Sequence, residues 1–215
     1  MKSITTLCLL LMLTCGMFSA CSKTKGTSAG NNDVTTNKDS LMNKKVLIVY
    51  LSRTNNTKAI ASIIQKNVGG TLVALELANP YPANYKQIVD QVANENSTGF
   101  LPPLKTKIDN IEQYDLIFLG FPTWGMQLPP PMKSFLKQYD LKGKTIVPFN
   151  TNAGYGIGST FQTVKELAPA STVTEGFSIK GGVERDGILF VMEGAKEKQA
   201  EAQIQTWLRK IKLLK

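Results

Sequence analysis

The chain of 215 residues contains no histidine. Serine and cysteine hydrolase chemistry that depends on histidine is therefore excluded, and so are histidine-ligated metal sites. Its three cysteines, Cys8, Cys15 and Cys21, all lie near the N-terminus. From residue 22 onward the chain can form neither a disulfide framework nor a thiol nucleophile. Redox chemistry in that part would need a cofactor.

Two phosphate-binding signatures are also missing from the sequence. No Gly-x-x-x-x-Gly-Lys-Ser/Thr motif is present, and no Gly-x-Gly-x-x-Gly motif follows the first expected strand, which argues against nucleoside triphosphate and dinucleotide sites. No basic run with interleaved aromatic residues is present, so we expect no nucleic-acid binding. The formal charge of +9 instead favours anionic membrane surfaces or acidic partner proteins.

The first twenty residues have the pattern of a secretory signal peptide. Lys2 precedes a short apolar segment over residues 7–18, and small residues lead to Cys21. The segment is too short to predict a transmembrane helix. Phe18-Ser19-Ala20-Cys21 resembles the lipobox of bacterial lipoproteins, which implies that Cys21 becomes the lipidated first residue of a protein anchored in the cell envelope, on the periplasmic side of the inner or outer membrane. A simple membrane anchor or an incidental cysteine is the alternative.

Residues 21–44 and 45–215 differ sharply in composition. Residues 22–44 are rich in Ser, Thr, Asn, Gly and Lys and poor in apolar residues, which predicts a flexible tether. Residues 45–215 alternate apolar runs with amphipathic segments, the pattern of a doubly wound α/β domain with a parallel sheet and helices on both faces. We expect strands over 46–51, 71–77, 114–121, 144–150 and 172–179, and helices over 56–67, 84–96, 131–139, 160–167 and 193–214.

The first expected strand leads directly into a polar loop. Val46–Leu51 is wholly apolar, and Ser52, Arg53, Thr54, Asn55, Asn56 and Thr57 follow. A strand, a tight loop and a helix N-terminus form an anion site, because free backbone N–H groups and the helix dipole point at the loop. An ordinary helix cap in a strand-to-helix turn is the alternative interpretation.

This stretch resembles the first strand and phosphate loop of the flavodoxin family, whose loop reads Ser/Thr-x-Thr-Gly-x-Thr. Ser52, Thr54 and Thr57 fall on its hydroxyl positions, and the resemblance implies that they wrap the phosphate of FMN. Asn55 replaces the usual glycine. Because asparagine tolerates the left-handed conformation better than other non-glycine residues, we expect the turn to be preserved.

Two later loops carry the same resemblance. Pro122-Thr123-Trp124-Gly125 resembles the segment that forms the inner wall of the flavin site, which implies that Trp124 is an aromatic plate. Thr151-Asn152-Ala153-Gly154-Tyr155-Gly156 resembles the family's Thr-x-Gly-Gly-x-Gly loop; Ala153 replaces one glycine, Tyr155 could stack on the outer face, and we expect glycine N–H groups to reach the ring edge. A core or surface tryptophan and a flexible surface turn are the alternatives.

The resemblance, together with five expected strands, implies the strand order 2-1-3-4-5 and a ligand at the carboxyl ends of strands one, three and four. The main interpretation is an FMN protein that carries electrons between redox partners. An FMN-dependent NAD(P)H:quinone-type reductase, or a binding module of the same shape that has lost FMN, are alternatives. Residues 46–215 carry 19 Lys and Arg against 14 Asp and Glu, so we expect partners with acidic surfaces. We assign no catalytic residue and no metal site.

Overall fold

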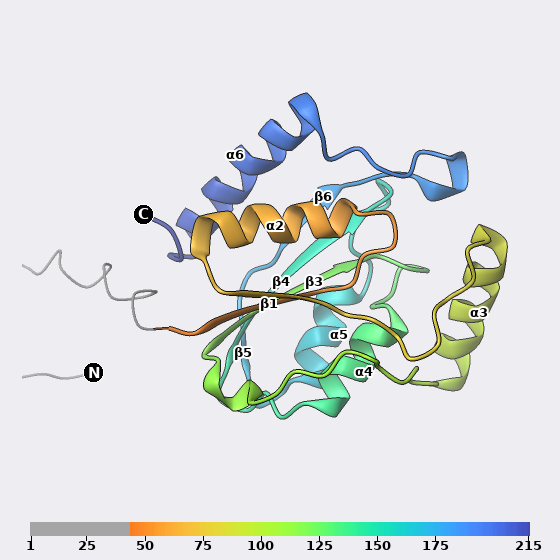
Figure 1. Cartoon of the computed structure of the whole chain (residues 1–215), viewed down its shortest axis with the longest axis horizontal. Helices are drawn as coiled ribbons and strands as arrows, with labels where there is room; N and C mark the ends of the chain where they lie inside the picture. The colour runs from red at the N-terminus through yellow and green to blue at the C-terminus, as the bar shows by residue number, and fades with distance from the viewer. Residues whose placement is uncertain (1–43) are drawn as a thin grey trace, which may run out of the picture. The chain divides into compact units, whose positions relative to one another are not determined.

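The computed structural model describes residues 44–215. The expected signal peptide, Cys21 and nearly all of the tether lie outside the described residues. Figure 1 shows the arrangement of the elements. The strands are β1 (Val46–Tyr50), β2 (Thr71–Ala74), β3 (Leu116–Pro122), β4 (Thr145–Asn152), β5 (Thr172–Val173) and β6 (Phe177–Lys180). The helices are α2 (Asn56–Val68), α3 (Tyr85–Thr98), α4 (Pro130–Gln138), α5 (Thr160–Leu167) and α6 (Gly194–Lys210). Two short 3-10 turns are η1 (Ile111–Gln113) and η2 (Glu184–Asp186).

The sheet is parallel throughout, with strand order β2-β1-β3-β4-β5 and β6 also paired to β4. The expected order 2-1-3-4-5 is therefore confirmed. Parallel neighbours need crossover connections rather than hairpins, and the helices supply them. The carboxyl ends of β1, β3 and β4 consequently meet at one edge of the sheet.

The fifth strand differs from the expectation of one continuous strand over 172–179. Ile146 pairs with Val173 and Phe149 pairs with Phe177. Between these two pairs, two residues of β4 face three residues of the segment that joins β5 to β6. One extra residue on one strand is the signature of a β-bulge. In a parallel strand, the backbone N–H and C=O groups of successive residues point in turn to one and then to the other neighbouring strand. The Ile146 carbonyl accepts a hydrogen bond from the β5 side. Pro148 therefore faces the same side, and because it has no N–H to donate, the ladder is interrupted there.

Helices cover both faces of the sheet. Figure 1 shows α2 and α6 on one face and α4 and α5 on the other. The strands between them are buried on both sides, which explains their unbroken apolar sequences. On the first face the buried contacts come from Ile60 and Ile64 of α2 and from Ile204 and Leu208 of α6; on the second they come from Met132 and Phe135 of α4 and from Val164 of α5.

Two expected elements are shorter in the structure. The second strand ends at Ala74 rather than residue 77, where Leu77 forms an isolated antiparallel bridge with Leu104. The C-terminal helix begins at Gly194 and ends at Lys210 rather than near residue 214. Within residues 44–215, no helix is both long and apolar enough to cross a membrane.

Helix α3 has few buried residues for its length. It lies beyond the edge of the sheet in Figure 1, and its buried residues are Ile88, Val92 and Glu95. Its first turn is capped by Asn84, whose Oδ1 accepts the Gln87 N–H at 3.1 Å. This position places α3 beside the loops at the carboxyl edge.

Candidate functional site

A cavity of about 530 Å³ opens at the carboxyl edge of the sheet. Its volume is in the range of small-molecule and cofactor sites. Loops after β1, β3 and β4 form its wall, as expected, together with the segment that follows β6. Of the residues predicted to form the site, those that line this cavity are Arg53, Thr54, Asn56, Thr57, Pro122, Thr123, Trp124, Gly125, Thr151, Asn152, Ala153, Tyr155 and Gly156.

Three predicted residues do not line the cavity, namely Ser52, Asn55 and Gly154. Ser52 accepts the backbone N–H of Lys58 on its Oγ at 3.2 Å, so its oxygen is used within the first turn of α2. Asn55 has φ 63° and ψ −3°, the left-handed conformation that the missing glycine of the phosphate loop would adopt. The expectation that asparagine preserves this turn is confirmed.

The loop before α2 presents a row of free backbone donors. Helix α2 begins at Asn56, and its first internal bond runs from the Ala59 N–H to the Asn55 carbonyl at 2.9 Å. The N–H groups of residues 54–57 donate to no acceptor within residues 44–215. Unpaired N–H groups at a helix N-terminus, together with the helix dipole, favour an anion.

Threonine hydroxyls add to this donor set. Thr54 Oγ1 accepts the Asn56 side-chain amide at 2.9 Å, which leaves its own hydrogen for another acceptor. Thr57 Oγ1 and Thr151 Oγ1 lie 2.8 Å apart and are both buried. One of the two donates to the other, so the second hydrogen is available to a ligand. A phosphate, which only accepts, fits these donors.

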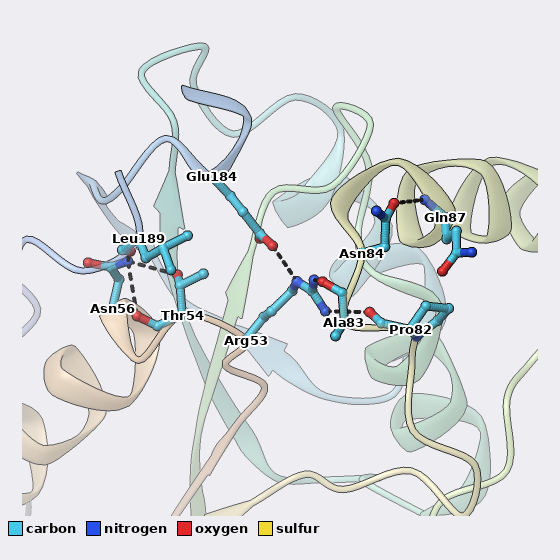
Figure 2. A network of polar contacts seen from close by, with 9 residues as sticks. All are labelled: Arg53, Thr54, Asn56, Pro82, Ala83, Asn84, Gln87, Glu184 and Leu189. Carbon is cyan, nitrogen blue, oxygen red and sulfur yellow. Dashed lines mark hydrogen bonds and ion pairs between the residues drawn. The ribbon is translucent and has the colours of Figure 1, made fainter. Parts of the chain in front are cut away.

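The Asn56 side chain has a structural role rather than a ligand-binding one. Its Nδ2 donates to the Leu189 carbonyl at 2.6 Å, and its Oδ1 accepts the Val191 N–H at 3.1 Å. Figure 2 shows this amide between the Thr54 side chain and Leu189. The side chain therefore attaches the segment after β6 to the start of α2, and what Asn56 offers to a ligand is its backbone N–H.

Arg53 is also committed to the protein. Its guanidinium forms an ion pair with Glu184 at 2.7 Å and donates to the carbonyls of Pro82 and Ala83 at 2.9 and 2.6 Å, as Figure 2 shows. Glu184 also lies in the cavity wall, so it balances the charge of Arg53 there. One side chain thus joins three segments of the chain.

Trp124 lies at the start of a tight turn. Its N–H and carbonyl exchange hydrogen bonds with Gln127 at 3.3 and 3.0 Å, and the two central residues, Gly125 and Met126, have φ of 56° and 61°. Positive φ at both central positions is the type I′ pattern. The ring of Tyr81 meets the Trp124 ring edge-on, with centroids 5.6 Å apart. The turn and Tyr81 together fix an aromatic wall for the cavity.

The loop after β4 differs from expectation in its hydrogen bonds. Asn152 Oδ1 accepts the N–H groups of Gly154 at 2.8 Å and Gly156 at 3.3 Å, so these groups are bound to the protein rather than free for a ligand. Both glycines have positive φ, of 101° and 88°, which explains why glycine stands there. Thr123 Oγ1 donates to the Gly156 carbonyl at 3.1 Å and ties the two loops together. Tyr155 is 64% exposed.

Sequence reasoning missed the wall that follows β6. A Cβ added to Gly182 would lie 2.3 Å from the Leu189 carbonyl, and one added to Gly181 would lie 3.3 Å from the Asn56 side chain. Only glycine allows this close approach at residue 182, so the Gly-Gly pair was the signal that could have indicated the segment. The lining residues that the sequence did not predict are Tyr85, Met126, Gly181, Gly182, Val183, Glu184 and Arg185.

Comparison with known proteins agrees with this geometry. The family profile described as flavodoxin matches residues 45–194, more than half of the chain. The chain belongs to the flavodoxin family. Within this family, a flavodoxin from Synechocystis sp. is 23% identical over 187 residues, which cover 78% of this chain and 96% of that protein.

Solved structures show the same flavodoxin-like fold. A Bacteroides eggerthii protein, provisionally described as a flavoprotein, is 29% identical with a TM-score of 0.63, and the match covers 79% of this chain and 98% of that one. A Lactobacillus acidophilus flavoprotein, solved in complex with FMN, is 24% identical with a TM-score of 0.57, covering 67% of this chain and 98% of that one.

Proposed function

We propose that this member of the flavodoxin family binds FMN and carries electrons between redox partners at the bacterial cell envelope. The observation that carries the proposal is the row of unpaired N–H groups at residues 54–57, which lies at the end of a cavity with an aromatic wall. These groups, with the hydroxyls of Thr54 and Thr57, would hold the phosphate. The Trp124 turn and the loop after β4 would hold the ring. When bound, FMN supplies one- and two-electron chemistry that no side chain of this domain provides.

The two departures from the family's loops do not oppose FMN binding. Asn55 adopts the left-handed conformation in place of glycine, and Ala153 is not among the described residues with positive φ, so a Cβ is tolerated there. The L. acidophilus flavoprotein that contains FMN also supports this function over a binding module that has lost the cofactor.

The rim of the cavity supports a role in protein–protein electron transfer. Met126, Tyr155 and Tyr85 line the cavity and are 45%, 64% and 40% exposed, although all three are large and apolar or aromatic. Exposed apolar groups around a cofactor site are typical of a docking surface. The net charge of +5 over residues 46–215 favours acidic partners.

Cys21 and residues 22–44 support the envelope location. A lipidated Cys21 followed by a polar tether would hold the domain near a membrane while leaving its cavity accessible. A second candidate function, reduction of a small quinone-type acceptor, is favoured by a further cavity beside the first.

Reconstitution tests the cofactor directly. The full chain carrying Cys21→Ser, which removes the proposed lipidation, is mixed with FMN, FAD or NAD⁺ and passed through a gel-filtration column. We expect FMN alone to co-elute with the protein at micromolar concentration, because the cavity offers one phosphate site. Elution of a colourless protein after incubation with FMN would refute the proposal.

A further inference from the structure

A second cavity, of about 400 Å³, lies between α3 and the Trp124 turn. Six residues line both this cavity and the proposed cofactor cavity, namely Arg53, Tyr85, Thr123, Trp124, Gly125 and Glu184. A molecule bound here would therefore be a neighbour of the cofactor across a shared wall. Nothing in the electron-carrier function requires such a cavity, since partner proteins exchange electrons at the surface.

The wall of this α3 cavity is mainly apolar. Ile88 and Val92 are buried at its base, whereas Val89 is 45% exposed. Tyr85 and Trp124 add two aromatic rings to the wall. Aliphatic side chains combined with aromatic rings favour a flat apolar ligand.

Two amide side chains in the wall have a hydrogen-bond donor that no acceptor within residues 44–215 uses. The Gln127 side chain bonds to none of the residues in 44–215. Asn96 Oδ1 accepts Lys133 Nζ at 2.8 Å, which orients the amide and leaves its Nδ2 without an acceptor among the described residues. Two amide donors in an apolar cavity suit a ligand that carries acceptor oxygens.

The charges in the wall cancel. Arg53 and Glu184 are the charged residues that line this cavity, and they pair with each other at 2.7 Å. Among the residues that line the cavity, a ligand with a net charge would find no unpaired counter-ion. The ligand that fits is uncharged.

We propose that the α3 cavity binds a flat, uncharged ring with carbonyl oxygens, the chemical class of the quinones. The Gln127 and Asn96 amides would donate to the carbonyl oxygens, and the rings of Tyr85 and Trp124 would contact the ring face. Electron exchange between the bound ligand and the cofactor rests on the proposed FMN function, whereas binding of the ligand in the α3 cavity does not.

Equilibrium dialysis with 2-methyl-1,4-naphthoquinone tests this proposal on the full chain carrying Cys21→Ser, with and without FMN. Ala93→Phe places a ring in the α3 cavity from an exposed helix position. Asn94→Phe, at the next and also exposed residue of α3, which does not line the cavity, is the matched control. We expect at least tenfold weaker naphthoquinone binding in Ala93→Phe, wild-type binding in Asn94→Phe and unchanged FMN absorbance in both.

Gln127→Ala provides a second variant that keeps the helix intact, and it should weaken naphthoquinone binding several-fold. The proposal is overturned if naphthoquinone does not bind, if Ala93→Phe and Gln127→Ala both bind it as the wild type does, or if FMN displaces it. Failure of FMN to bind in the same samples would refute the proposed function instead, because the dialysis without FMN measures the α3 cavity independently.

Discussion

The hydroxyl of Thr54 is a donor whose hydrogen has no acceptor within the described protein. Its oxygen accepts the Asn56 amide at 2.9 Å, so the hydrogen is left for a ligand in the cavity. A hydrogen bond to a charged group contributes about 1.5–3 kcal/mol. We therefore expect Thr54→Val to weaken FMN binding by about ten- to a hundredfold while riboflavin, which lacks the phosphate, loses little.

Fluorescence titration of both ligands measures this difference. Thr206→Val is the matched control, because the Thr206 hydroxyl bonds within α6 to the Ala202 carbonyl and does not line the cavity. Equal losses for FMN and riboflavin would place the phosphate elsewhere.

Asn55 stores backbone strain that glycine would not. Its side chain makes no cap hydrogen bond, and its φ is 63°. The left-handed region costs a residue with a Cβ about 1–2 kcal/mol, most for β-branched side chains. Asn55→Gly should therefore raise the urea midpoint slightly or leave it unchanged, and Asn55→Val should lower the free energy of unfolding by about 1–2 kcal/mol. A fully stable Asn55→Val would show that the turn takes another conformation.

Tyr81 links Trp124 to the buried Glu95. Its hydroxyl donates to Glu95 Oε2 at 2.5 Å, and burial, followed by this hydrogen bond and the acid's charge, raises the pKa of Tyr81 well above its usual value. An unfolded tyrosine titrates near pH 10. Because the folded pKa is raised, the stabilisation is present below about pH 10 and is lost as the pH rises further.

Urea unfolding at pH 8 and pH 11 checks this expectation. The stability advantage of the wild type over Tyr81→Phe should be smaller at pH 11. An advantage that does not change between the two pH values would remove Tyr81 from the pH dependence.

At the scale of elements, Arg53 determines how firmly α3 is held. It joins the loop after β1 to the Pro82 and Ala83 carbonyls that precede α3. We expect Arg53→Met to accelerate amide hydrogen exchange in the first turn of α3 at least tenfold, because bonds from a charged donor are lost. Lys86→Met is the control, since the Lys86–Asp90 pair is 82% and 63% exposed and contributes little. Equal exchange in both variants would mean that α3 is held by other contacts.

The elements that the sequence predicted well are those whose pattern reports burial directly. The apolar runs of β1 and β3 identified strands covered on both faces. The interrupted fifth strand was missed because its cause, Pro148, stands on a different strand. The effect of Pro148 depends on which neighbouring strand faces the position of its missing N–H, and the strand register determines that.

The candidate site was also predicted only in part from the sequence. Motif positions placed thirteen residues on the cavity, but their roles depended on partners distant in sequence. Glu184 pairs with Arg53 across 131 positions, and Asn56 bonds to Leu189 across 133. The glycine N–H groups of the loop after β4 were expected to be free, but the nearby Asn152 side chain accepts their hydrogen bonds. The sequence does not show whether an asparagine side chain bonds to the neighbouring backbone.

At the scale of the whole molecule, anchoring and folding are expected to be separate. Within the part of the chain that the structure describes, the buried apolar core spans residues 46–213, and the sequence of residues 22–44 is poor in apolar residues. We expect Cys21→Ser to release the protein from the membrane fraction without changing the melting temperature of the domain. Fractionation in high salt, followed by calorimetry, measures both. A variant that still sediments with membranes would contradict lipid anchoring at Cys21.

In the proposed function, the N-terminus of α2 binds the phosphate of FMN. Amide proton and nitrogen NMR spectra test it most directly, because the backbone N–H groups of residues 54–57 are the proposed donors. We expect FMN to shift these four signals strongly, whereas riboflavin should shift signals of the Trp124 turn and the loop after β4 and leave these four nearly unchanged. If FMN leaves the signals of residues 54–57 in place, or if riboflavin shifts them equally, the phosphate site is not at α2.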